Sequence, residues 1–165
     1  MMPAVLLLAF VTMERLGELW LANRNTKALL ARGAYEAAPG HYRLIVLLHA
    51  AWLAGLWLFG WGRGLDPVWL TLFLLLQGLR LWVLATLGRR WTTRIIILPG
   101  ASLISTGPYR FMTHPNYLVV VGEIAILPLC LGLPWYALGF SAANALVLTI
   151  RIRAENEALR GLRGV

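Results

Sequence analysis

The chain has 165 residues, of which 59% are hydrophobic and 13% charged, and its formal net charge is +8. An ordinary soluble domain carries about 25% charged residues, so this composition excludes that class and indicates an integral membrane protein of one domain, residues 1–165. The basic residues lie between apolar segments, where membrane topology accounts for them, so we expect no nucleic-acid partner.

Two further features narrow the class. Cys130 is the single cysteine and lies in an apolar segment, which excludes an internal disulfide and a cysteine-based metal cluster. No residue spacing typical of metal ligands occurs in the sequence, so we expect no metal. The N-terminal apolar segment lacks a basic start and a small-residue cleavage site, and we therefore expect a retained span rather than a signal peptide.

Apolar segments separated by polar or turn-forming residues recur along the chain. Several approach the roughly 20 residues that a helix needs to cross a bilayer. We predict an all-α fold, a polytopic transmembrane helical bundle with five spans. The expected spans are residues 3–21, 43–61, 68–87, 116–131 and 135–150.

The first span carries charge in its second half. Glu14 and Glu18 are four residues apart and share a helix face, as a structural ion-pair set or as the polar end of a lipid cavity; we favour the ion pairs. In the polar segment that follows, Ala28–Gly33 is expected to form a short interfacial helix that ends at its glycine. In the second span we interpret His49 as a packed, hydrogen-bonded histidine.

The third span, which contains Arg80, leads into a polar connection. Ile95–Leu98 is too short to cross a membrane, and we expect a strand-like or interfacial piece there. The most polar stretch, Thr106–Leu118, comes next. Pro108 and Pro115 each lack an N–H and bias the preceding residue away from helix. This stretch is therefore predicted to be a shaped loop at the membrane edge, where we expect the chemistry.

The last two spans form a helical hairpin. A tight turn at Pro134 joins them, and Glu123 lies inside the fourth span. In the fifth span, Asn144 is expected to join helices by hydrogen bonding. Residues 151–160 are expected to continue as a charged amphipathic helix.

Basic residues set the predicted orientation. They gather in the segments between spans one and two, between spans three and four, and after span five, whereas the opposite side has only Arg63. The positive-inside rule makes the basic side cytoplasmic. We therefore expect an N-terminus outside the cytoplasm and a C-terminus inside it.

This topology brings the polar loop and the tail to the same side. The hairpin makes the cytoplasmic ends of its two helices neighbours, so a cytoplasmic metabolite is expected to bind between them. The facing residues are Tyr109, His114 and Tyr117 in the loop and Arg151, Arg153, Glu155 and Asn156 in the tail.

The same two segments carry a family resemblance. Gly107-Pro-Tyr109, then His114-Pro-Asn-Tyr117, a helical hairpin, and Arg151–Leu159 together resemble the isoprenylcysteine carboxyl methyltransferase family. The resemblance covers Ser105–Leu159. It implies an integral-membrane enzyme that uses S-adenosylmethionine to methylate a carboxylate or a related oxygen of a lipophilic substrate.

Three features of the chain depart from the family pattern. Thr113 stands where the family has Arg, Asn156 stands where a second Glu is expected, and the chain ends at Val165 without the longer tail of eukaryotic members. The short form, with Glu123 and the His-Pro-Asn-Tyr element, resembles bacterial members that O-methylate phenolic or pyrone lipids made by type III polyketide synthases.

The resemblance assigns the cofactor to elements 105–118 and 151–159. For several of these residues a structural role is open beside the functional one. His114 with its proline can merely cap the fourth span, Tyr117 can be an interfacial anchor, and Glu155 can be a solvated charge. The expected S-adenosylmethionine contacts are Tyr109, His114, Pro115, Tyr117, Leu118, Arg153, Glu155 and Asn156.

Arg80, Glu123 and Arg151 are the expected catalytic residues. Ionisable groups inside a bilayer are costly and are functional candidates by default. Arg80 and Glu123 can pair with one another, or Glu123 can act as a base. Arg151 can hold an acidic group or anchor the helix on the positive side of the membrane.

Two other functions stay open from the sequence. A reductase of related architecture would use NADPH, and a small membrane assembly protein would have no cofactor at all. The expected partners are a lipophilic small-molecule substrate and the bilayer. The acceptor is left open between a prenylcysteine, a phenolic or pyrone lipid and a phospholipid, and the oligomeric state is open too.

Overall fold

The computed structural model describes residues 2–163, without the side chains of 41 and 160–163. Helices make up most of this part of the chain, and the all-α prediction is confirmed. The long helices are α1 (Met2–Leu30), α2 (Tyr42–Gly60), α3 (Pro67–Leu87), α4 (Pro115–Cys130) and α5 (Pro134–Arg163). Short 3₁₀ turns lie at η1 (Pro39–His41), η2 (Gly88–Arg90) and η3 (Gly107–Arg110), and a two-stranded sheet joins β1 (Tyr35–Glu36) to β2 (Ile96–Ile97).

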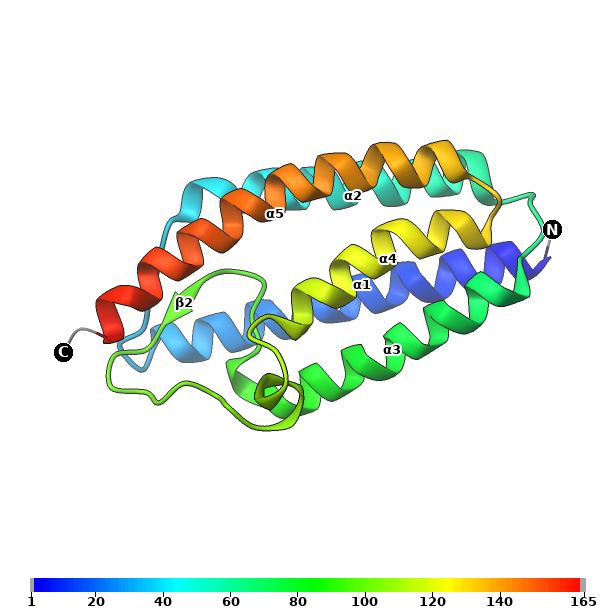
Figure 1. Ribbon diagram of the computed structural model, residues 1–165. Helices are drawn as coiled ribbons and strands as arrows, with labels where there is room; N and C mark the ends of the chain where they lie inside the picture. The colour runs from blue at the N-terminus through cyan, green and yellow to red at the C-terminus, as the bar shows by residue number, and fades with distance from the viewer. Residues whose placement is uncertain (1, 164–165) are drawn as a thin grey trace.

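The helices are arranged in antiparallel fashion (Figure 1). α2 and α5 run side by side, α3 lies on the opposite side of the bundle, and α1 and α4 lie between them. The start of α1 and the short turns before α3 and α5 lie at one end. The long α3–α4 connection and the C-terminal part of α5 lie at the other end, so the polar loop and the tail share one end as predicted.

Three helical segments are long and apolar enough to cross a membrane: Tyr42–Gly60, Pro67–Arg90 and Pro134–Leu159. α4 is apolar but has only 16 residues, a length of about 24 Å against a hydrocarbon core of about 30 Å. α1 is longer but carries charge at its centre. The chain is thus a membrane-type helical bundle, and the count of five spans stays a prediction.

α1 differs from the prediction at its end. It continues without a break to Leu30, so Ala28–Gly33 is not a separate interfacial helix. The Asn25 side chain explains the continuation, because its amide donates to the carbonyls of Trp91 at 2.8 Å and Gly88 at 3.2 Å and fixes the last turns of α1 against the loop. Gly33 follows with a φ of 86°, which ends the helix where expected.

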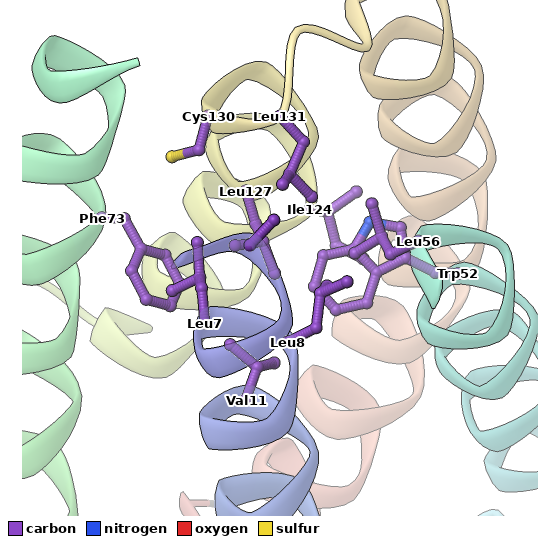
Figure 2. Close-up of a cluster of buried hydrophobic side chains, with 11 residues drawn as sticks. Leu7, Leu8, Val11, Trp52, Leu56, Phe73, Ile124, Leu127, Cys130 and Leu131 are labelled. Carbon is purple, nitrogen blue, oxygen red and sulfur yellow. The ribbon is translucent and has the colours of Figure 1, made fainter. Parts of the chain in front are cut away.

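The turn end of the bundle holds the apolar core. Asp66 caps α3 by accepting hydrogen bonds from the backbone N–H groups of Val68 and Trp69 at 2.9 and 3.2 Å, and Pro67 occupies the first helical position. Figure 2 shows the buried cluster, which draws on α1, α2, α3 and α4. Its largest members are Trp52, Phe73, Leu8 and Leu56.

The opposite end is built from loops. Tyr35 pairs with Ile97 and Glu36 with Ile96 in an antiparallel register, so the strand-like interpretation of Ile95–Leu98 is confirmed. Glu36 also accepts a hydrogen bond from Arg94 at 2.8 Å, and this bond raises the pKa of Arg94. The α1–α2 and α3–α4 connections are therefore tied together.

Candidate functional site

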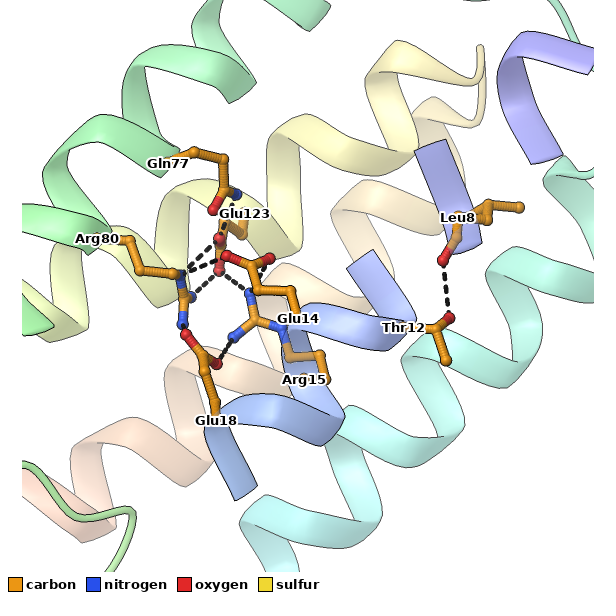
Figure 3. A network of polar contacts seen from close by, with 8 residues as sticks. All are labelled: Leu8, Thr12, Glu14, Arg15, Glu18, Gln77, Arg80 and Glu123. Carbon is orange, nitrogen blue, oxygen red and sulfur yellow. Dashed lines mark hydrogen bonds and ion pairs between the residues drawn. The ribbon is translucent and has the colours of Figure 1, made fainter. Parts of the chain in front are cut away.

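A network of buried charges lies in the middle of the bundle (Figure 3). Arg80 of α3 is 3% exposed; its Nε donates to Glu123 of α4 at 2.9 Å, and it also pairs with Glu18 of α1. Arg15 of α1 donates to Glu18 and to Glu123, both at 2.7 Å. The two guanidinium groups therefore bridge α1, α3 and α4, and the Arg80–Glu123 pairing that the sequence left open is present.

Two more groups complete this network. Gln77 donates to Glu123 at 2.7 Å, and Glu14 lies 3.7 Å from Arg15 and 3.8 Å from Arg80. The charged groups thus pair with one another, as buried ions in a membrane protein are expected to do, although Glu14 Oε2 and Arg15 Nε make no hydrogen bond among the described residues. This arrangement fits the structural interpretation of Glu14 and Glu18.

A second polar centre lies where the loop meets the tail. The Tyr117 hydroxyl, at the start of α4, accepts a hydrogen bond from Arg151 Nε at 2.9 Å and donates one to Glu155. Arg151 also donates to the backbone carbonyl of Thr93 at 2.8 Å. One phenol oxygen therefore joins two residues of α5 to α4, and the guanidinium extends the connection to the α3–α4 loop.

His114 is held beside this centre. It precedes α4, whose first residue is Pro115, and its ring stacks on that of Tyr117 with centroids 5.1 Å apart and planes 23° apart. His114 Nδ1 lies 3.8 Å from Glu155 Oε2. The two aromatic faces and the carboxylate therefore stand together at the start of α4.

A cavity of about 450 Å³ opens beside these residues. Its volume lies within the range of roughly 300–1,000 Å³ that small-molecule sites have. The wall is mixed and combines apolar residues, among them Ile96 and Ile97 of β2, with polar groups. The polar lining residues are Arg90, Thr92, Arg94, Ser105, Tyr109, Thr113, His114, Asn116, Tyr117, Arg151 and Glu155.

Tyr109 contributes a neutral hydroxyl to this polar cavity. Burial and the nearby charge of Glu155 raise the pKa of Tyr109 to about 12. The ordinary tyrosine value is about 10, so the group keeps its proton at physiological pH and can donate or accept a hydrogen bond.

A second cavity, of about 320 Å³, lies between α1, α2, α4 and α5. Its wall is mainly apolar, with Leu16, Ile45, Leu53 and Val147 among its members. Both cavities share a set of lining residues, so they meet. The shared residues are Trp91, Thr92, Asn116, Tyr117 and Arg151.

The structure gathers part of the predicted site. Tyr109, His114, Tyr117 and Glu155 line the polar cavity, and Arg151 lines both cavities. Arg80 lines the apolar cavity, and Glu123 lies behind it in the ion-pair network. Pro115 is buried beneath the polar cavity without lining it, whereas Leu118, Arg153 and Asn156 are exposed and line neither cavity.

Other lining residues were not predicted. Arg15 had a signal in the sequence, because a charged residue inside a span is a functional candidate by default. Trp91 and Thr93 had none, since each reaches the site only through the path of the α3–α4 loop. Asn116 lies inside the predicted element 105–118 but was not among the contacts expected from it.

Comparison with known proteins bears on this site. Residues 69–161, which contain both halves of the polar cavity's charged centre, match the Isoprenylcysteine carboxyl methyltransferase (ICMT) family. The chain belongs to this family. Membership in the ICMT family implies a membrane methyltransferase in the broad sense, which agrees with the long apolar helices.

Two bacterial relatives resemble this ICMT-family chain along most of its length. The uncharacterized protein YpbQ of Bacillus subtilis is 35% identical over 164 residues, which cover 94% of this chain and 95% of the relative. An uncharacterized protein of Haemophilus influenzae is 25% identical over 154 residues, 90% of each chain. No solved structure matches the chain significantly.

Proposed function

We propose that this protein transfers a methyl group from S-adenosylmethionine to a carboxylate or phenolic oxygen of a lipophilic acceptor. One observation carries the proposal: a polar cavity and an apolar cavity meet at Tyr117 and Arg151. A polar methyl donor and a lipophilic acceptor need one polar and one apolar compartment that share a boundary. The reacting atoms would meet at that boundary.

The polar cavity has the groups that the donor requires. The His114 and Tyr117 rings offer faces for a nucleobase, and the Glu155 carboxylate can accept hydrogen bonds from ribose hydroxyls or an ammonium group. Arg90 lines the same cavity and can hold a carboxylate. When bound, S-adenosylmethionine supplies a methyl group already activated by a positively charged sulfur.

Arg151 is the residue best placed to hold the acceptor. Its Nε and one terminal nitrogen are engaged by Tyr117 and Thr93. Its other terminal nitrogen makes no hydrogen bond to any residue in the described part of the chain. That N–H group can hold an anionic oxygen at the boundary, while the apolar walls around it exclude water. Positioning and desolvation are the main contributions that a methyl transfer needs.

The proposal is tested by transfer of label. Purified protein in lipid vesicles is incubated with methyl-labelled S-adenosylmethionine and a bacterial lipid extract, and label is counted in the organic phase. We expect label in the lipid fraction and a loss of about 100-fold in Arg151→Gln. Arg89→Gln is the matched control, because Arg89 is exposed and lines neither cavity.

Two results would contradict the proposal. One is a lipid fraction without label at any lipid composition. The other is displacement of bound, labelled S-adenosylmethionine by NADPH and not by the demethylated donor. That result would favour the reductase.

A further inference from the structure

The apolar cavity contains a polar side chain without a partner. Asn144 of α5 is 3% exposed and lines this cavity. Its amide makes no hydrogen bond to any residue within 2–163, so the expected bond between helices is not formed among the described residues. A buried amide without a partner is unfavourable, and a ligand that supplies the partner gains affinity from it.

His49 of α2 lines the same cavity. Its Nδ1 lies 2.8 Å from the carbonyl oxygen of Ile45. Because a carbonyl can only accept, Nδ1 carries the proton, and in the neutral ring Nε2 is left as an acceptor. This fits the expected hydrogen-bonded histidine, yet Nε2 has no partner in the part of the chain that the structure describes.

The two residues lie at one depth, below the boundary between the cavities. Asn144 stands seven residues before Arg151 in α5, and His49 stands seven residues after Tyr42 in α2. Seven residues of helix rise about 10 Å. α2 and α5 are packed side by side in opposite directions (Figure 1), and Tyr42 and Arg151 both bond to Thr93. Counted from this common level, the helix rise puts His49 and Asn144 about 10 Å further along the bundle.

The neighbouring ion pairs are not the groups that would bind a ligand in this cavity. Arg15, Glu18 and Arg80 also line the cavity, but their charged groups bond mainly to one another and to Glu123. Trp52 Nε1 and Arg15 Nε also lack a hydrogen-bond partner among the described residues, but both atoms are buried and can only donate.

The neutral acceptor without a partner in this cavity is His49 Nε2, and the buried amide without one is that of Asn144. A hydroxyl group fits both, since it donates to His49 Nε2 and accepts from the Asn144 amide. A pure hydrocarbon chain would leave both without partners.

We propose that His49 and Asn144 form a second polar subsite, which selects lipid acceptors with a hydroxyl group about 10 Å from the methylated oxygen. The inference rests on the proposed function for the position of the methylated oxygen. It identifies the acceptor class as oxygenated lipids rather than plain hydrocarbon tails.

Three labelled fatty acids test the subsite by equilibrium binding to purified protein in detergent, without the methyl donor. They are stearic acid, stearic acid with a hydroxyl on its tenth carbon, and stearic acid with a hydroxyl on its second carbon. We expect the mid-chain hydroxyl to increase affinity about tenfold over stearic acid, and the hydroxyl beside the carboxylate to add nothing.

Two variants assign the preference to the subsite. In His49→Phe and in Asn144→Leu the mid-chain preference should disappear, while stearic acid itself binds at least as tightly as to the wild type, because no polar group is left without a partner beside its hydrocarbon chain. His49→Gln retains an acceptor oxygen and should keep part of the preference. Retained stearic acid binding also reports that each variant has folded.

Equal affinity of the wild type for all three acids would overturn the subsite, as would a preference that survives in both variants. Binding of S-adenosylmethionine, measured on the same samples, separates the two proposals. If the wild type fails to bind the donor but prefers the acid with the mid-chain hydroxyl, only the proposed function is contradicted.

Discussion

Tyr117 holds the candidate site together through a single oxygen. Its hydroxyl accepts from Arg151 and donates to Glu155, and its ring stacks on His114. With only 9% of the residue exposed, water cannot readily replace the hydroxyl. Removal of one partner from such a buried arrangement leaves the other groups unsatisfied, which costs about 1–3 kcal/mol.

Tyr117→Phe is therefore expected to weaken S-adenosylmethionine binding by about tenfold, since the freed Glu155 and Arg151 no longer keep their positions. The measurement is equilibrium binding of the labelled donor to the purified variant. Tyr35→Phe is the matched control, because Tyr35 is exposed in β1 and lines neither cavity. Equal affinities of Tyr117→Phe and the wild type would exclude this role for the hydroxyl.

At the residue scale, the sequence predicted those contacts of the site that lie between helices joined by a short turn. The turn at Pro134 brings α4 and α5 together, so the meeting of Tyr117 with Arg151 and Glu155 could be expected. The pairing of Arg15 with Glu123 was not predicted, because the two residues are 108 apart in the chain. Hydrophobic patterning cannot indicate a pairing of that kind, because it depends on how α1 packs on α4.

At the scale of elements, the loop between α3 and α4 depends on one close approach. Gly107 begins η3 with a φ of 58°, a conformation that side chains other than glycine rarely adopt. A Cβ at this position would collide with the side chain of Thr86 on α3. The loop that carries Tyr109 and His114 is therefore docked on α3 at its glycine.

Gly107→Ala is expected to lower the melting temperature in detergent and to weaken donor binding, because both strain and collision act on the loop. Gly100→Ala is the matched control, since Gly100 has a φ of 74° but open space around it. It should show the smaller, strain-only effect of about 1 kcal/mol. The double variant Gly107→Ala with Thr86→Ala should recover part of the loss. If both single variants behave alike, the docking contact is unimportant.

The bounds of the helices were largely predictable because their signals are local. Pro67, Pro115 and Pro134 are the first residues of helices in the structure. The apolar segments between polar residues predicted the lengths of these helices. The end of α1 was not predictable, since the Asn25 side chain bonds to carbonyls 63 and 66 residues away. The apolar cavity was not predictable either, because it exists only between packed helices.

At the scale of the whole molecule, the two ends of the bundle differ in charge. The loops before α2 and α4 and the tail of α5 carry most basic residues, and all lie at the end with the polar cavity. The opposite end contains the turns near Gly64 and Gly132. The positive-inside rule predicts that the cavity end faces the cytoplasm.

Cysteine labelling tests this orientation. Cys130 is 0% exposed, so the background from a membrane-impermeant maleimide should be low. In intact spheroplasts we expect Gly64→Cys to be labelled and Arg89→Cys to be labelled only after the membrane is opened. The reverse pattern would place the polar cavity outside the cytoplasm and remove its access to the cytoplasmic donor.

Binding of labelled S-adenosylmethionine to the purified protein, in detergent and in lipid, tests the central claim most directly. We expect saturable binding that weakens at least about tenfold, or about 1.4 kcal/mol, in His114→Ala and in Glu155→Ala. Glu157→Ala is the control on the same helix, because Glu157 is exposed and does not line the cavity. Failure of the wild type to bind the donor in both media, or full affinity in both cavity variants, would contradict the account.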